Sequence, residues 1–187
     1  MRRLIGPLVG VLVAVGGVLA LLLFFSGRDS AGVRSTAPSG PGQLQPDRGH
    51  RHVALHAPRP DARPGCTRRR CDPPTSGPLT PVRVPGDRVP LGDDQILHAL
   101  ELGNVVIFYP GDRTVPVPGP LRAVQRRVAG GRSTPTLIAV GQAVILSPRG
   151  GSGIVAAAWR HLLHARDPGD PRLLKFAQYW LSNTPDL

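Results

Sequence analysis

The residues best placed to act together are one histidine and one glutamate. His98 and Glu101 stand three residues apart in a segment whose apolar side chains recur with the period of a helix. Positions three apart share a helix face, so the imidazole and the carboxylate could contribute to a zinc or copper site. The alternative is a structural role, in which His98 packs against the turn at residues 73–77. The pair alone is a weak metal signal, because zinc usually takes three or four protein ligands.

Three further patterns suggest a metal site or a catalytic motif but lack the context that the chemistry needs. His161 and His164 could be metal ligands together only if their segment were helical, because only then would they share a face. Ser152 lies between glycines, as a nucleophile can, but a hairpin turn explains this pattern better. The Thr-Pro-Thr at residues 134–136 resembles the proline loop of thioredoxin-like folds, without an accompanying C-x-x-C. We therefore assign no catalytic residue, and a binding protein is favoured over an enzyme.

Short helices and strands alternate over residues 71–187. We predict helices over residues 95–102, 120–128 and 171–181, and strands over 104–109, 137–140 and 143–146. Asp93 and Asp94 are candidate caps for the first helix. Residues 154–163 fit either a strand or a helix. The mixture predicts a small α+β domain with a few short strands and helices.

An apolar segment precedes this domain. Residues 4–25 contain no charged side chain, and 22 residues at about 1.5 Å each span a hydrocarbon core of roughly 30 Å. We predict a single transmembrane helix; the alternative, a cleaved signal peptide, needs a shorter apolar run and small residues at its end. The short basic tail at residues 1–3 favours a cytoplasmic N-terminus and an extracytoplasmic C-terminal domain at the cell membrane.

Residues 26–70 are predicted to form a disordered tether rich in Pro, Gly and Arg. The stretch from residue 27 to residue 90 holds 12 Pro, 8 Gly and no aromatic side chain. Residues 1–90 carry a net charge of +8, against +3 for residues 91–187. Nucleic-acid binding is not expected, because basic residues without interleaved aromatics do not make a stacking surface. Attraction of the tether arginines to anionic lipid headgroups is the sharper alternative to a solvated chain.

Two cysteines close the tether. Cys66 and Cys71 enclose four residues, and a disulfide can close a loop of this length. In an exported segment the two cysteines would be expected to oxidise to a disulfide. The alternative is a pair of metal thiolates, but no second cysteine pair completes such a site. We favour the disulfide.

Several segments together carry a family resemblance. They are the turn Pro73, Pro74, Thr75, Ser76 and Gly77, the run from Ile96 to Tyr109, the Val144–Pro148 segment, the Ala158-Trp159 pair and the early His52-Val53. In these segments the chain resembles the bacterial membrane-anchored family known as domain of unknown function 3105, over roughly residues 50–187. The resemblance implies one N-terminal span, an exported domain, and a strand rather than a helix at residues 154–163.

The chain departs from the family at two positions. The family pattern has a histidine after Ser-Gly-Pro and another after Leu-Glu, which with the helix histidine and an early histidine implies a metal site. Here these positions are Leu79 and Leu102, leaving His98, Glu101 and His52. We predict that the two leucines touch and fill the former pocket, with His98 hydrogen-bonded at its edge.

Two functional hypotheses follow. The first is a membrane-held binding or envelope-assembly module with an unknown protein partner, no cofactor and a degenerate family site. The alternative is a zinc- or copper-binding protein, or a metal-dependent enzyme, that uses His98 and Glu101. The leucine replacements favour the first hypothesis because apolar side chains cannot donate to a metal.

Overall fold

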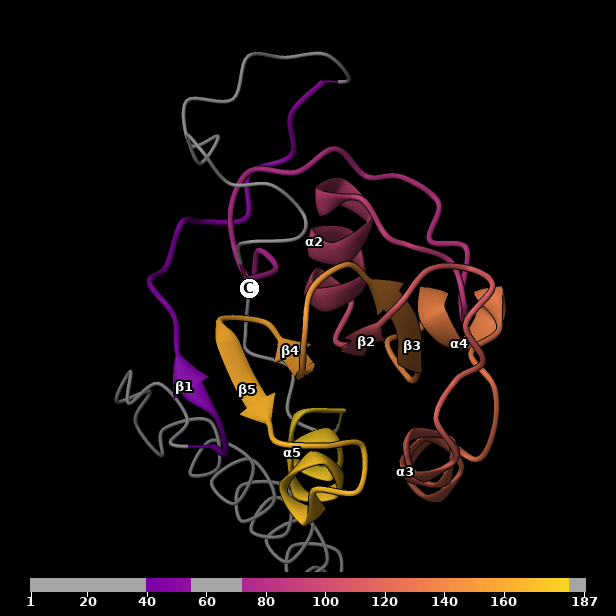
Figure 1. The fold of residues 1–187 in the computed structure, drawn as a ribbon. Coiled ribbons are helices and arrows are strands. Elements are labelled where there is room, and N and C mark those ends of the chain that lie inside the picture. The colour runs from indigo at the N-terminus through magenta and orange to yellow at the C-terminus, as the bar shows by residue number, and fades with distance from the viewer. Residues whose placement is uncertain (1–39, 55–71, 182–187) are drawn as a thin grey trace, which may run out of the picture. The chain divides into compact units, whose positions relative to one another are not determined.

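The structure is a computed structural model that describes residues 40–54 and 72–181 (Figure 1). These residues belong to one compact unit that runs from Gly40 to the end of the chain. The unit has the predicted α+β class. Its strands are β1 (Gln43–Leu44), β2 (Val105–Pro110), β3 (Val144–Arg149), β4 (Ile154–Ala158) and β5 (His161–Ala165). Its helices are α2 (Asp93–Glu101), α3 (Gly119–Ala129), α4 (Pro135–Ala139) and α5 (Pro171–Leu181).

The five strands form one sheet in the order β1-β5-β4-β2-β3. Strands β2 and β3 are parallel, whereas β4 is antiparallel to both β2 and β5, and β1 is antiparallel to β5. Residues 154–163 are strand and not helix, as the family resemblance implied, but they belong to two strands, β4 and the first part of β5. The connection that holds Ser152 is not a hairpin turn, because β2 lies between β3 and β4.

Helices cover both faces of the sheet (Figure 1). Strand β2 is buried on both sides, and its side chains alternate between two apolar clusters. Val105 and Ile107 face a cluster that includes side chains of α3 and α5. Val106 and Phe108 face a second cluster that includes side chains of α2 and the single buried residue of α4, Ile138. A strand covered on both faces needs a continuous apolar run, as the sequence of β2 has.

One predicted strand is a helix instead. Residues 137–140 were expected to be a strand, but α4 runs through Ala139. The Thr134 hydroxyl accepts a hydrogen bond from the Leu137 amide at 3.3 Å, and Pro135 occupies the first helical position. These two starting signals outweigh the strand preference of a short apolar run. In α2, likewise, Asp93 and Asp94 lie in the first turn and Gly92 is the cap.

Part of the predicted tether packs on the domain. Residues 40–54 were assigned to the disordered stretch 26–70, yet Gln43 and Leu44 pair with β5. The indole of Trp180 donates a hydrogen bond to the Pro41 carbonyl at 2.8 Å. A segment held through its backbone needs no apolar period, so composition alone could not reveal it.

Two predictions concern residues that the structure does not describe. The expected span at residues 4–25 and the expected Cys66–Cys71 disulfide both lie outside the described residues. Among residues 40–54 and 72–181, no helix is both long and apolar enough to cross a bilayer.

Candidate functional site

The residues of the predicted family site lie at the C-terminal end of α2. We call His52, Leu79, His98 and Glu101 the family corner. The Nε2 atom of His52 lies 2.9 Å from each carboxylate oxygen of Glu101. The His52 side chain is 55% exposed and that of Glu101 is 14% exposed, so this contact lies at the surface. The structure therefore brings together two of the three candidate ligands, which are 49 residues apart in sequence.

Leu79 is paired through its backbone with His52. It forms an isolated parallel bridge with His52, in which the Val53 amide donates to the Leu79 carbonyl at 2.9 Å. Its side chain is 0% exposed and belongs to the apolar cluster on the α2 face of the sheet. The histidine of the family pattern is thus replaced here by a core residue. Leu102 differs, because it is half-buried and belongs to neither apolar cluster, so only one of the two leucines fills the core.

His98 does not join the His52–Glu101 pair. Its Nδ1 atom donates a hydrogen bond to the Val82 carbonyl at 2.7 Å. The expectation of a hydrogen-bonded His98 is confirmed, and its partner is the Val82 carbonyl. Nowhere in residues 40–54 and 72–181 do three or more His, Cys, Asp or Glu side chains cluster so as to hold a metal ion.

The Pro-Pro-Thr-Ser-Gly turn organises the backbone around the family corner. The Ser76 hydroxyl donates to the Pro46 carbonyl and accepts from the Arg48 amide, both at 3.0 Å. The Gly77 amide donates to the Gly49 carbonyl at 2.7 Å, and its φ of 140° is one that favours glycine. Thr75 accepts a bond from the Arg160 amide through its carbonyl. The turn therefore fixes residues 46–49 beside β5, which in turn positions His52.

His161 and His164, which the sequence also offered as ligands, are held by structural contacts as well. His161 is buried in β5, stacks on Trp180 at a ring-centroid distance of 3.8 Å and donates from Nδ1 to the Trp159 carbonyl. His164 is exposed and its Nε2 lies 3.2 Å from an Asp72 carboxylate oxygen. Because β5 is a strand, positions three apart point to opposite faces, and the two imidazoles do not face one metal ion together.

A family model described as "Protein of unknown function (DUF3105)" matches residues 69–186. The chain belongs to this family. No curated protein and no solved structure matches it. The family description assigns no activity, so the chemistry of this member has to be argued from its own residues.

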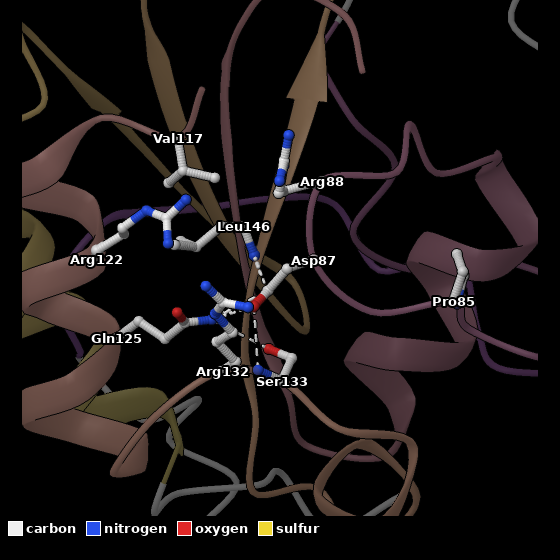
Figure 2. A pocket seen from close by; sticks show the side chains of 9 residues that line it. All are labelled: Pro85, Asp87, Arg88, Val117, Arg122, Gln125, Arg132, Ser133 and Leu146. Carbon is white, nitrogen blue, oxygen red and sulfur yellow. Dashed lines mark hydrogen bonds between the residues drawn. The ribbon is translucent and has the colours of Figure 1, made fainter. Parts of the chain in front are cut away.

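A second candidate site lies along the outer edge of β3, and sequence reasoning missed it. The cavity has a volume of about 240 Å³ and is lined by three arginines, Arg88, Arg122 and Arg132, together with Asp87, Gln125 and Ser133 (Figure 2). We call it the arginine pocket. Arg122 comes from α3, whereas Arg88 and Arg132 come from the segments before α2 and α4.

Asp87 builds the floor of the arginine pocket. One of its carboxylate oxygens accepts from the Leu146 amide at 3.0 Å, and the other accepts from the Ser133 amide at 3.1 Å. The buried Gln125 amide nitrogen lies 2.9 Å from both oxygens and also donates to the Val144 carbonyl at 2.8 Å. These side chains satisfy the edge of β3, which would otherwise leave strand groups unpaired.

The backbone of the pocket is held in an uncommon conformation. Arg88 has a φ of 65°, in the left-handed region that non-glycine residues rarely adopt. Its amide donates to the Leu146 carbonyl at 2.8 Å, which fixes this geometry against β3. Nearby, burial raises the pKa of the Tyr109 hydroxyl, an effect that Arg88 and Arg122 oppose and Asp87 adds to. That hydroxyl is buried without a hydrogen-bond partner among the described residues.

Proposed function

We propose that the chain is a single-pass membrane protein whose extracytoplasmic domain is a binding or envelope-assembly module, not a metalloenzyme. The apolar segment at residues 4–25 would be the anchor, and the short basic tail supports an outward domain. The tether arginines would lie near anionic headgroups. The partner would be another protein of the envelope.

The observation that carries this proposal is the occupation of the family corner. Leu79 is a fully buried core residue where the family pattern has a histidine. The carboxylate of Glu101 is engaged by His52, and the Nδ1 atom of His98 is engaged by a backbone carbonyl. With a leucine in the place of one family imidazole, the corner has fewer donors than zinc takes from a protein.

A zinc or copper function remains the second candidate because of one contact. His52 and Glu101, which are distant in sequence, place an imidazole nitrogen and a carboxylate within 2.9 Å of each other. One imidazole and one carboxylate are fewer than the three or four protein ligands that zinc takes. A metal at this contact would therefore need further ligands from outside the described residues.

Two measurements on the full-length chain test the proposal. Protease added to intact spheroplasts should remove the domain while leaving the anchor; full protection of the domain would contradict the extracytoplasmic location. Elemental analysis of the purified chain should give well under one equivalent of zinc or copper. A stoichiometric metal would contradict the binding-module proposal and favour the second candidate.

A further inference from the structure

The arginine pocket concentrates positive charge that the protein does not neutralise. Within the described parts of the chain, Arg88, Arg122 and Arg132 form no ion pair with a carboxylate. The nearest acid, Asp87, is held by uncharged donors, namely two backbone amides and the Gln125 side chain. Three guanidinium groups and one carboxylate leave a formal charge of +2 at the pocket.

The donors of the pocket are suited to an oxyanion. A guanidinium carries five N–H donors in a planar fork, which matches the oxygens of phosphate or carboxylate and contributes no acceptor. Figure 2 shows Arg132 beside the Asp87 network, whereas Arg122 and Arg88 line the pocket farther from it; each of the three comes from a different segment of the chain. Donors from three segments can surround a tetrahedral group, whereas arginines on one helix face would form a flat patch.

The floor of the pocket is organised before any ligand arrives. Gln125 is 2% exposed, and with Ser133 and Asp87 it is fixed to the backbone of β3. The hydrogen bond from the Arg88 amide to the Leu146 carbonyl holds Arg88 in the left-handed region. Uncommon backbone conformations that surrounding bonds maintain are frequent at ligand sites. A preformed floor also lowers the entropic cost of binding.

We propose that the arginine pocket binds a phosphate monoester or inorganic phosphate. The formal charge of +2 matches a phosphate group with a charge near −2, whereas a single carboxylate would leave half of it unneutralised. A volume of about 240 Å³ holds a phosphate and part of whatever bears it. The same group could come from free phosphate in solution or from a lipid headgroup such as that of phosphatidic acid.

The test uses the full-length chain in detergent, with inorganic phosphate as the probe and acetate at equal ionic strength as the comparison. Phosphate should raise the melting temperature and give a dissociation constant by calorimetry. The double variant Arg122→Gln with Arg132→Gln should weaken phosphate binding about tenfold for each arginine removed. The control is Arg113→Gln with Arg126→Gln, two exposed arginines that do not line this cavity and that change the net charge equally.

A second arm separates the two sources of phosphate. The chain is placed in phosphatidylcholine nanodiscs with and without phosphatidic acid, and its melting temperature is compared. Binding of free phosphate supports a soluble ligand, and a rise only with phosphatidic acid supports a headgroup; either must be lost in the Arg122/Arg132 variant. The proposal is overturned if neither probe binds, if acetate binds as well as phosphate, or if the control variant loses binding equally. If circular dichroism shows that the double variant is unfolded, Arg132→Gln alone carries the test, since that side chain is exposed.

Discussion

The family corner and the arginine pocket share one segment of the chain, but the first is filled by an apolar side chain and the second is an open cavity. Residues 72–90 supply Leu79 to the first and Asp87 and Arg88 to the second. In the family corner a leucine enters the core and the polar groups find protein partners. In the arginine pocket an aspartate reaches the sheet edge and three guanidinium groups stay open to solvent. The comparison teaches that one proline-rich segment can fill a site with an apolar side chain at one position and line an open pocket with polar side chains at another.

The largest effect should come from the closed region. Leu79→Ala removes a fully buried side chain and should lower the free energy of unfolding by about 3 kcal/mol. For a domain of this size the melting temperature should fall by about 10 °C. The matched change Leu102→Ala, at a half-buried position outside the core clusters, should cost about 1 kcal/mol or less. Equal losses from the two variants would mean that Leu79 does not close the corner.

The second effect tests the frame of the open region. Asp87→Asn replaces one acceptor oxygen by an amino group opposite protein donors, which should cost about 2 kcal/mol in the free energy of unfolding. The control Asp93→Asn changes the same charge at an exposed position in the first turn of α2 and should cost well under 1 kcal/mol. Chemical denaturation of both variants measures the difference. A stability equal to wild type for Asp87→Asn would show that this aspartate does not hold the edge of β3.

Acid should distinguish the packed part of the domain from its surface. Burial lowers the pKa of His161 from its ordinary value of 6.5; the hydrogen bond to Trp159 opposes this effect, and the charge of Arg160 adds to it. The folded protein then binds fewer protons at this residue than the unfolded chain, so stability falls as the pH drops through 6.5 toward the lower value. Arg172 and nearby amides also lower the pKa of Asp170, but that carboxyl affects stability only in more acidic solution, near and below 4.

The variant His161→Gln isolates this effect. It should remove part of the loss in the free energy of unfolding between pH 7 and pH 5. Its stability at pH 7 will be lower because the stacking on Trp180 is lost. An unchanged slope with pH would show that His161 is not the group that titrates.

The smallest effect should come from the surface contact between His52 and Glu101. His52→Gln removes a surface contact to Glu101 and should change the free energy of unfolding by about 0.5 kcal/mol or less. His50→Gln, a neighbouring exposed histidine, is the control. A cost of several kcal/mol for His52→Gln alone would mean that this contact, and not Leu79, holds the corner together.

Local patterns in the sequence predicted most of the helices and strands. The helix expected at residues 171–181 is α5, because Pro171 starts it and its apolar residues recur at helical spacing. Helices α2 and α3 and strand β2 lie within two residues of their predicted bounds, for the same reason. Helix α4 was missed because its few apolar residues outweighed the Thr-Pro start in the prediction.

The two sites were predictable to different degrees. The family resemblance directed attention to His52 and Glu101, which the fold does bring together, but it could not show that His98 would turn to Val82. The arginine pocket left no local signal, since Arg88, Arg122 and Arg132 are three among 22 arginines spread over the chain. Asp87 acts on residues up to 59 positions away, and single-sequence periodicity carries no information on such contacts.

The closure of the family corner is tested most directly by titrating zinc and copper into two full-length chains. One is the wild type, and the other carries Leu79→His with Leu102→His, which restores the family pattern beside His52 and Glu101. We expect no binding by the wild type at micromolar metal. The double variant should be less stable without metal and regain stability when one equivalent is added. Binding of one equivalent by the wild type at micromolar affinity would contradict the account.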